Sequence, residues 1–247
     1  MTHQEFVSGE PAQRRYWLRS MTGWSSWAER SRPNAAHAAL AAMQRAGRLA
    51  GGLITQNVDR LHHAAGASEV VELHGTTHRV HCLACGADSC RHELQSRLAA
   101  LNPAAVAPAA GAGQQRPDGD VELAADAHAA FALPSCAACG GGPLKPAVVF
   151  FGASLEPGVA ARSRELAASC DAVLVVGSSL AAWSAFRLAE TAAKRGSPVA
   201  ILNVGPTRAD ALATLRVEAR AAEALPRVLA HGGLDLPPLS DAHAPRT

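Results

Sequence analysis

Four polar residues in one short stretch of the sequence carry side chains that can bind a polar ligand and move a proton. Gln56, Asn57 and Asp59 directly follow an apolar run, and a second short apolar run ends in His74. Amides and a carboxylate at the carboxyl end of a strand lie where open α/β sheets bind ligands. The ordinary pKa of histidine suits a general base near neutral pH. The pattern indicates a binding site, although one histidine among 11 is more often structural and Asp59 could instead cap the following turn.

Two Cys-x-x-Cys-Gly motifs form a second group with recognisable chemistry. Each motif offers two thiolates to one tetrahedral ion, and its glycine relieves the tight turn. Two motifs fill all four positions, so we expect a structural zinc ion with no open position for water. The expected ligands are Cys82, Cys85, Cys136 and Cys139. The alternative is four unconnected reduced cysteines, and Cys90 and Cys170 lie outside both motifs.

A third group of polar residues suggests a nucleotide. Gly177, Ser178 and Ser179 follow an apolar run and precede a helical pattern. Small residues there let a nucleotide approach the backbone, while hydroxyls and helix N–H groups bind ribose or phosphate. Asn203 ends the next apolar run and faces the same edge of the sheet. A Gly-Ser-Ser turn alone is weak evidence, but together these residues fit a dinucleotide site.

These segments occur together, in the same order, in a known family. The chain resembles the sirtuins, the NAD-dependent protein deacylases, in the segments TQNVDRLHHAAG, VVELHG, HCLACG, CAACGG, KPAVVFFG, VVGSSL and AILNVGPT. The resemblance covers residues 33–230 and is strongest to bacterial sirtuins that look like the mitochondrial class II branch. Sirtuins open with a Gly-Ala-Gly-x-Ser turn and a Gly-Ile-Pro segment, and the sequence contains neither.

The resemblance assigns roles to the polar residues. Gln56, Asn57 and Asp59 would line a nicotinamide pocket, Asn203 would bind ribose, and His74 and Asn57 would be catalytic. The implied cofactors are NAD and Zn2+. The resemblance implies a reaction in which the acyl oxygen of a modified lysine would attack the ribose C1′ and nicotinamide would leave. His74 would then accept a proton as a ribose hydroxyl is activated, and water would yield free lysine and O-acyl-ADP-ribose.

One apolar segment is similar to the strand on which sirtuins lay the substrate backbone by β-augmentation. On it we expect Val148, Phe150 and Gly152 to bind substrate, with Val149 and Phe151 packing on the alternate face. A plain core strand is the alternative. Ala153 stands where most sirtuins carry an acidic residue.

The composition bounds the fold. The chain has 247 residues, 48% apolar and 18% charged, which is typical of a globular protein with a sizeable core. Strands alternating with helices predict an α/β fold, a Rossmann-like parallel sheet with a small four-cysteine zinc-ribbon insert domain. The expected parts are 1–75 (first part of the Rossmann-like domain), 76–145 (zinc module, mobile loop 102–120), 146–233 (second part) and 234–247 (flexible tail).

The expected helices span 10–20, 33–45, 91–101, 158–169, 183–195 and 221–230, with a helical turn at 61–65. The expected strands span 49–56, 148–151, 172–176, 199–203 and 215–218, and the run 172–176 should be buried on both faces. The aromatic residues of the N-terminal segment should pack rather than bind, and His37 should be a structural histidine.

The sequence also favours a cellular setting and partners. A net charge of +2 predicts no strong attraction to nucleic acid. The N-terminus lacks the apolar core of a signal peptide, and no apolar run is long enough to span a membrane. We therefore expect a cytoplasmic protein that keeps its cysteines reduced, acts on acyl-lysine proteins and is a monomer.

The resemblance leaves several functions open. The first is NAD-dependent deacylation, and the second is mono-ADP-ribosyl transfer or lipoamidase chemistry at the same site. The third is a truncated, inactive chain that acts as a zinc-binding interaction module. This reading arises because the sequence lacks the Gly-rich turn that binds phosphate in sirtuins and the strand of the sheet that precedes the turn. We favour a misassigned start over that third reading. A dehydrogenase is disfavoured because no Gly-x-Gly-x-x-Gly turn with an acidic ribose partner is present.

Overall fold

The computed structural model describes residues 1–49, 51–106 and 128–239, without the side chains of residues 25–29. Most of the loop predicted at 102–120 and the last eight residues of the tail predicted at 234–247 lie outside the described residues. No helix within the described ranges is both long enough and apolar enough to cross a lipid bilayer.

Five short strands form the parallel part of the fold, and they fall into two groups. Strand β1 (Leu53–Thr55) pairs in parallel with β2 (Val70–Glu72). Strand β7 (Val199–Leu202) pairs in parallel with β6 (Val173–Val176) and β8 (Leu215–Val217). The parallel pairing confirms the predicted α/β class, but among the described strands the two groups share no ladder hydrogen bonds.

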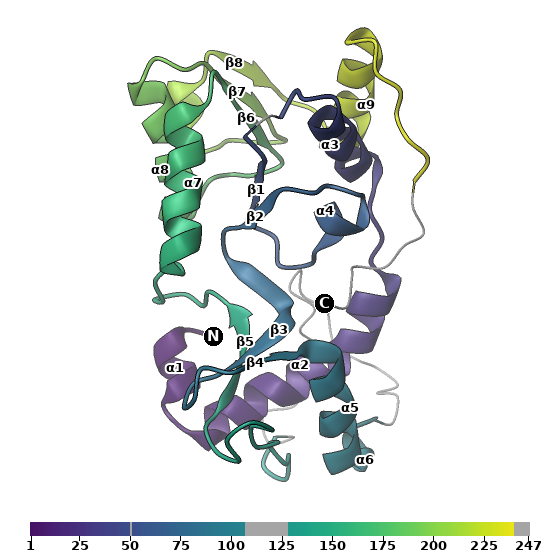
Figure 1. The fold of residues 1–247 in the computed structure, drawn as a ribbon, viewed down its shortest axis with the longest axis vertical. Coiled ribbons are helices and arrows are strands. Elements are labelled where there is room, and N and C mark those ends of the chain that lie inside the picture. The colour runs from purple at the N-terminus through teal and green to yellow at the C-terminus, as the bar shows by residue number, and fades with distance from the viewer. Residues whose placement is uncertain (50, 107–127, 240–247) are drawn as a thin grey trace.

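Helices cover this part of the molecule on two sides (Figure 1), with α7 and α8 on one side and α3 and α9 on the other. Their apolar faces form two cores, one around Leu73, Val175 and Ile201 and one around Leu40, Leu225 and Leu229. The helical segments are α3 (Ala35–Arg45), α4 (Leu61–Ala64), α7 (Pro157–Ser169), α8 (Trp183–Lys194), η1 (Asp210–Leu212) and α9 (Ala221–His231).

Local sequence explains where two of these helices begin and end. Asn34 caps α3 by accepting from the backbone N–H groups of Ala36 and His37, and the His37 ring accepts from the Asn34 N–H at 3.2 Å. The helix therefore begins after Asn34 rather than at the predicted residue 33, and His37 has the predicted structural role. Gly196 follows the C-cap of α8 with φ +84°, a conformation that glycine adopts without strain.

The second part of the molecule is an antiparallel sheet with helices packed on it, drawn at the bottom of Figure 1. Strand β3 lies between β4 and β5. The elements of this part are α1 (His3–Val7), α2 (Glu10–Arg30), β3 (Gly75–Cys82), β4 (Asp88–Cys90), α5 (Arg91–Leu101), α6 (Pro103–Val106) and β5 (Leu144–Val148).

The N-terminal helices pack on this second part and not on the parallel strands with which the sequence groups them. Phe6 of α1 and Trp17 of α2 are buried in the same core as Val80, Leu94 and Leu98. The indole N–H of Trp17 donates to the carbonyl of Leu144 at 2.8 Å, which satisfies the one polar atom of a buried ring. The predicted packing role of the N-terminal aromatics is confirmed for Trp17 and for Trp24, which is also buried.

Three strand predictions need correction. The segment predicted at 148–151 is a strand at Leu144–Val148 instead, because it pairs with β3 across Gly75, Val80 and Cys82. The strand predicted at 49–56 is confined to Leu53–Thr55, the length over which β2 pairs with it. The strand at 172–176 was expected to be buried on both faces, yet Leu174 is 38% exposed, since β6 has one neighbour among the described strands.

The junction between the two parts is closely packed at one residue. Gly75 has φ +76°, and a Cβ atom there would lie 1.9 Å from the carbonyl oxygen of Ala147. The next backbone contact along the chain is a hydrogen bond from the N–H of Val149 to the carbonyl of His74 at 2.9 Å. The chain can therefore pass from β2 into β3 only with glycine at position 75.

We predict that Gly75→Ala lowers the free energy of unfolding by roughly 2–4 kcal/mol, because the added methyl collides with backbone that cannot move aside. Gly196→Ala is the matched control, since Gly196 also has a positive φ but has no atom within 4 Å of its Cβ position. The control should cost only about 1 kcal/mol. Denaturant unfolding of both variants measures the difference, and equal losses would contradict the close approach.

Candidate functional site

His74 lies between β2 and β3, and its ring faces the start of α8. Its Nε2 atom is 2.9 Å from the hydroxyl oxygen of Ser184, in the first turn of that helix. The preceding residue, Leu73, is 1% exposed and anchors the turn in the core, and its N–H donates to the carbonyl of Thr55. The ring is thus held between the carboxyl end of β2 and a helix N-terminus, as a histidine that works in a cleft requires.

The surroundings keep the His74 ring neutral. Burial lowers the pKa of His74 below its ordinary value of 6.5, and a hydrogen bond with the backbone of Gln56 acts in the opposite direction. The lowering dominates, so the ring is mostly unprotonated at pH 7 and can accept a proton.

The side chain of Gln56 connects the two groups of parallel strands. Gln56 follows β1, and its amide nitrogen donates to the hydroxyl of Ser178 at 2.7 Å. Ser178 follows β6, and its hydroxyl also accepts from the N–H of Leu180 at 3.1 Å. The structure therefore brings Gln56, Ser178 and His74 to the carboxyl ends of the parallel strands, where the sequence predicts the site.

Asn57 and Asp59 lie on the same loop as Gln56 but differ in their contacts. The Asn57 side chain is exposed, and its backbone N–H donates to the hydroxyl of Thr55 at 3.1 Å. One oxygen of Asp59 accepts from the N–H of Leu61 at 3.0 Å, in the turn that leads through the N-cap Arg60 into α4. This hydrogen bond uses one carboxylate oxygen, so the local role and the predicted ligand role are compatible.

Two contacts hold this loop in place. The carbonyl of Val58 accepts from both the N–H and the hydroxyl of Thr77 on β3, at 3.1 and 3.0 Å. The rings of His37 and His62 lie 4.7 Å apart between α3 and α4, and burial is the largest cause that lowers the pKa of His62 to about 4. Both histidines are therefore neutral packing groups near pH 7.

The remaining residues predicted to bind the nucleotide lie in the loops that directly follow β6 and β7. Gly177 has φ +57°, and the carbonyl of Ser179 accepts from the N–H of Arg208 at 2.9 Å. The amide group of Asn203 donates to the carbonyls of Val204 and Gly205 at 3.0 and 3.1 Å. Asn203 thus supports its own loop with its side-chain nitrogen.

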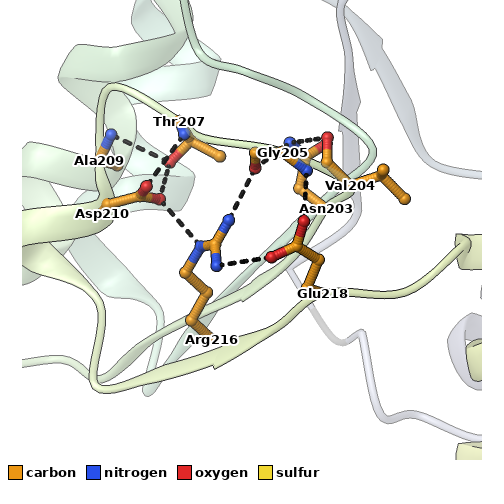
Figure 2. Close-up of polar contacts among 8 residues, drawn as sticks. All are labelled: Asn203, Val204, Gly205, Thr207, Ala209, Asp210, Arg216 and Glu218. Carbon is orange, nitrogen blue, oxygen red and sulfur yellow. Dashed lines mark hydrogen bonds and ion pairs between the residues drawn. The ribbon is translucent and has the colours of Figure 1, made fainter.

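Figure 2 shows how charged residues fix the loop after β7. The guanidinium of Arg216 donates to the carbonyl of Gly205 at 2.8 Å and pairs with Glu218 at 3.2 Å and with Asp210 at 3.4 Å. The hydroxyl of Thr207 donates to Asp210 at 2.6 Å, and the bonds at the carboxylate lower the pKa of Asp210. These contacts tie the residues of the loop to the start of η1 and to β8, and the N–H of Arg208 links the same loop to Ser179.

The segment predicted to bind substrate is arranged differently from the expectation. Phe150 is 9% exposed and packs edge-on against Phe6, with a ring-centroid distance of 5.6 Å, so its side chain is a core residue. Phe151, predicted to pack, is instead 81% exposed. The reversal arises because residues 150 and 151 lie beyond β5, where Thr2 of the N-terminal segment bridges Phe151 in parallel. The backbone carbonyls of Val148 and Gly152 accept hydrogen bonds from the side chains of Lys145 and Gln4.

The four cysteines of the two motifs converge as predicted. Their sulfur atoms all lie within 4.8 Å of one another, with Cys82–Cys139 and Cys85–Cys136 both at 3.8 Å. Zinc–sulfur bonds of about 2.3 Å in a tetrahedron place sulfur atoms about 3.8 Å apart, so the cluster has the size of a zinc shell. Gly86 and Gly140 have φ +77° and +74°, which confirms their role in the turns.

The backbone prepares this cluster for a cation. N–H groups of Cys139 and Ala138 bond to the sulfur of Cys136 and lower the pKa of that thiol to about 6. A thiolate at neutral pH is the form that ligates zinc. The pKa of Cys85 moves the other way: a backbone hydrogen bond from Ala87 lowers it, but the neighbouring thiols of Cys139 and Cys82 raise it to about 12. Four cysteine ligands would leave no open coordination position, so the ion that they fit is structural.

The fold and the site together define a Rossmann-like α/β protein with a four-cysteine zinc module and a histidine at the edge of the parallel strands. The family model described as "Sir2 family" matches residues 1–184. The chain therefore belongs to the Sir2 family, the sirtuins, as the sequence motifs predict.

Relatives and solved structures agree with this assignment. The chain is 45% identical to the NAD-dependent protein lipoamidase sirtuin-4 of Bos taurus, over 92% of this chain and 70% of the relative. It is 46% identical to NAD-dependent protein deacetylase 2 of Bradyrhizobium diazoefficiens, over 90% and 79%. A solved structure described as "Sir2-p53 peptide-NAD+" superposes with a TM-score of 0.65 at 28% identity, over 83% of this chain and 72% of that one.

Sequence reasoning missed Ser184, although it contacts the predicted base directly. Ser184 lies 110 residues after His74, in a helical pattern that gives no sign of a polar partner. The available signal was its place in the first turn of a helix just after the Gly-Ser-Ser segment, where hydroxyls face the carboxyl edge of a parallel sheet.

We predict that the purified chain contains about one zinc ion and that Cys139→Ser removes it and destabilises the module, since three ligands cannot close the shell. Cys170→Ser is the control, because Cys170 lies outside the cluster, at the end of α7. Elemental analysis and thermal unfolding measure both effects. A zinc-free wild-type chain, or equal losses in the two variants, would contradict the assignment.

Proposed function

We propose that the chain is an NAD-dependent protein-lysine deacylase that releases nicotinamide and transfers the acyl group to ADP-ribose. One observation carries the proposal: the segment after β6 contacts both halves of the predicted site. Ser178 bonds to Gln56, and Ser184 bonds to His74. These contacts support the proposal because they bring Gln56, the proposed nicotinamide ligand, and His74, the proposed base, to one edge of the parallel strands.

The residues of this edge match the parts of NAD. Asn57 offers an amide with a donor and an acceptor, and Asp59 offers the carboxylate oxygen that α4 does not use, which together suit a carboxamide. Gly177, Ser178, Ser179 and the oxygen of Asn203 would hold ribose hydroxyls and phosphate. When bound, NAD supplies the ribose carbon that accepts the acyl oxygen and the nicotinamide that leaves.

His74 would hold and move the proton of the reaction. Its ring is neutral at pH 7, and Nε2 points away from the protein backbone toward Ser184. A ribose hydroxyl that reaches Nε2 can transfer its proton there, which makes the oxygen a better nucleophile. Asn57, on the adjacent exposed loop, would orient the reacting ribose.

The substrate class follows from the family and from the relatives. Acetylated peptide is the ligand of one solved sirtuin structure with 28% identity to this chain, and lipoamidase is the named activity of one relative. We propose acyl-lysine proteins as substrates, bound beside the segment 148–152, and lipoyl-lysine as a second candidate acyl group. We further propose a cytoplasmic monomer without nucleic-acid partners, consistent with reduced zinc ligands and the small net charge.

The packing supports a two-part division of the described chain. We propose that residues 75–148, with α1 and α2, form the zinc module, and that the remaining elements form the Rossmann-like domain. The shared core of Phe6 and Trp17 with Val80 supports grouping the N-terminal helices with the zinc module.

The test is nicotinamide release from NAD with acetyl-, lipoyl- and unmodified-lysine peptides. We predict release that depends on the acyl group, and a loss of at least about 100-fold in kcat on His74→Ala, because a general base contributes that much. His231→Ala at the exposed end of α9 is the matched control. Release that is independent of the acyl-lysine peptide, or full activity of the His74→Ala variant, would refute the proposal.

The pH dependence follows from the lowered pKa of His74. The base is active when unprotonated, so kcat/KM should be level near pH 7 and fall only as the pH drops through a pKa below 6.5. This fall of kcat/KM at low pH, the acid limb of the profile, should be absent from the residual activity of His74→Ala. A wild-type limb centred above pH 6.5 would contradict burial as the dominant influence on this ring.

A further inference from the structure

We infer that Ser184 is a positioning residue for His74, and that its hydroxyl fixes the proton-free nitrogen of the ring before substrate arrives. The inference deepens the proposed function and rests on it for its kinetic part. Its structural part concerns two side chains of the unliganded chain and can be judged alone.

The hydroxyl of Ser184 is used differently from most serines at a helix start. Such serines usually bond to the free N–H groups of their own first turn. The N-cap of α8 is Ala182, which has no side-chain oxygen, and α8 has no side-chain cap. The hydroxyl of Ser184 instead lies 2.9 Å from Nε2 of His74.

Besides Ser184, the backbone of Gln56 acts on the ring. The backbone of Gln56 raises the pKa of His74, the direction expected for a carbonyl that accepts a hydrogen bond from the ring. The proposed role requires the tautomer with its proton on Nδ1, in which Nε2 accepts from the hydroxyl of Ser184.

The helix N-terminus that carries Ser184 reinforces the neutral ring. The unsatisfied N–H groups of a first turn carry a partial positive charge, which disfavours a protonated imidazole nearby. Burial acts in the same direction and is the largest cause of the lowered pKa. The hydroxyl and the helix end together keep a lone pair on Nε2.

The first turn of α8, which carries Ser184, packs against the loop after β7. The guanidinium of Arg208 lies 4.2 Å from the centre of the Trp183 ring, and that ring packs edge-on against Phe186 at 5.5 Å. The backbone N–H of Arg208 donates to the carbonyl of Ser179. The loop after β7, held by the ion pairs of Figure 2, therefore supports the first turn of α8 from outside.

This arrangement predicts a role in turnover and not in cofactor affinity. A ribose hydroxyl can reach Nε2 only when the Ser184 hydroxyl releases that nitrogen. The Ser184 hydroxyl therefore orients the ring first and is then replaced by the ribose hydroxyl. Ser184 takes no proton from the substrate itself. Its removal should free the ring to rotate, which lowers the fraction of His74 in the productive orientation.

The first experiment is nitrogen-15 NMR of the His74 ring in the full chain without ligand. We expect one dominant tautomer, with Nδ1 protonated, in the wild type and in Ser184→Thr, which keeps the hydroxyl. Ser184→Ala should show averaged ring shifts for His74 only. Ser169→Ala is the matched control, because the Ser169 hydroxyl bonds only to backbone carbonyls of its own helix.

The second experiment measures turnover of the same variants. Ser184→Ala should lower kcat roughly five- to ten-fold with little change in KM for NAD, the size expected for one lost hydrogen bond. Ser184→Thr should retain most of kcat, and the acid limb of the pH profile should stay in place. If Ser184→Ala does not fold, Ser184→Cys replaces it, since a thiol has the same shape but donates weakly.

The outcomes separate the two proposals. Unchanged His74 shifts in the folded Ala or Cys variant would overturn the positioning role, whatever the activity. Altered shifts with kcat within two-fold of wild type would also overturn it. If the wild type releases no nicotinamide, the proposed function fails, and the NMR result still decides whether Ser184 orients the ring.

Discussion

The site depends on one backbone contact between two different sheets. The carbonyl of His74 accepts from the N–H of Val149, and directly beside it Gly75 lies against the carbonyl of Ala147. This approach joins the end of β2 to the end of β5 with no room for a side chain. This contact fixes the position of the His74 backbone, and it places the proposed substrate segment next to His74.

The other half of the site is fixed by side chains rather than by a shared sheet. Among the described strands, β1 and β6 are not hydrogen-bonded to each other, so their relative position depends on contacts such as Gln56 to Ser178 and on the core around Val175. The segment after β6 then runs past the site to Ser184. One stretch of chain therefore contacts both Gln56, the proposed nicotinamide ligand, and His74, the proposed base. The four-cysteine cluster lies at the other end of the β3–β5 pair, where Cys82 pairs with Leu144, while Gly75 pairs with Val148 beside His74.

Features that depend on nearby residues could be predicted from the sequence. The zinc ligands follow from the spacing within each motif, and the polar residues at strand ends follow from the alternation of strands and helices. Features that depend on distant packing could not. The reversal of Phe150 and Phe151 results from a bridge with Thr2, and the placement of α1 and α2 on the zinc module results from Trp17 and Phe6 filling a core between distant strands. Ser184 escaped notice because its bond to His74 spans 110 residues.

The central claim is that Asn57, Ser178 and His74 surround one nicotinamide-ribose pocket. A crystal structure of the chain with NAD and an acyl-lysine peptide tests this most directly. We expect the carboxamide at Asn57 and Asp59, a ribose hydroxyl within hydrogen-bonding distance of Nε2 of His74, and the acyl-lysine beside the 148–152 segment. A dinucleotide bound away from His74, or a His74 ring that stays on Ser184 with substrate in place, would contradict the claim.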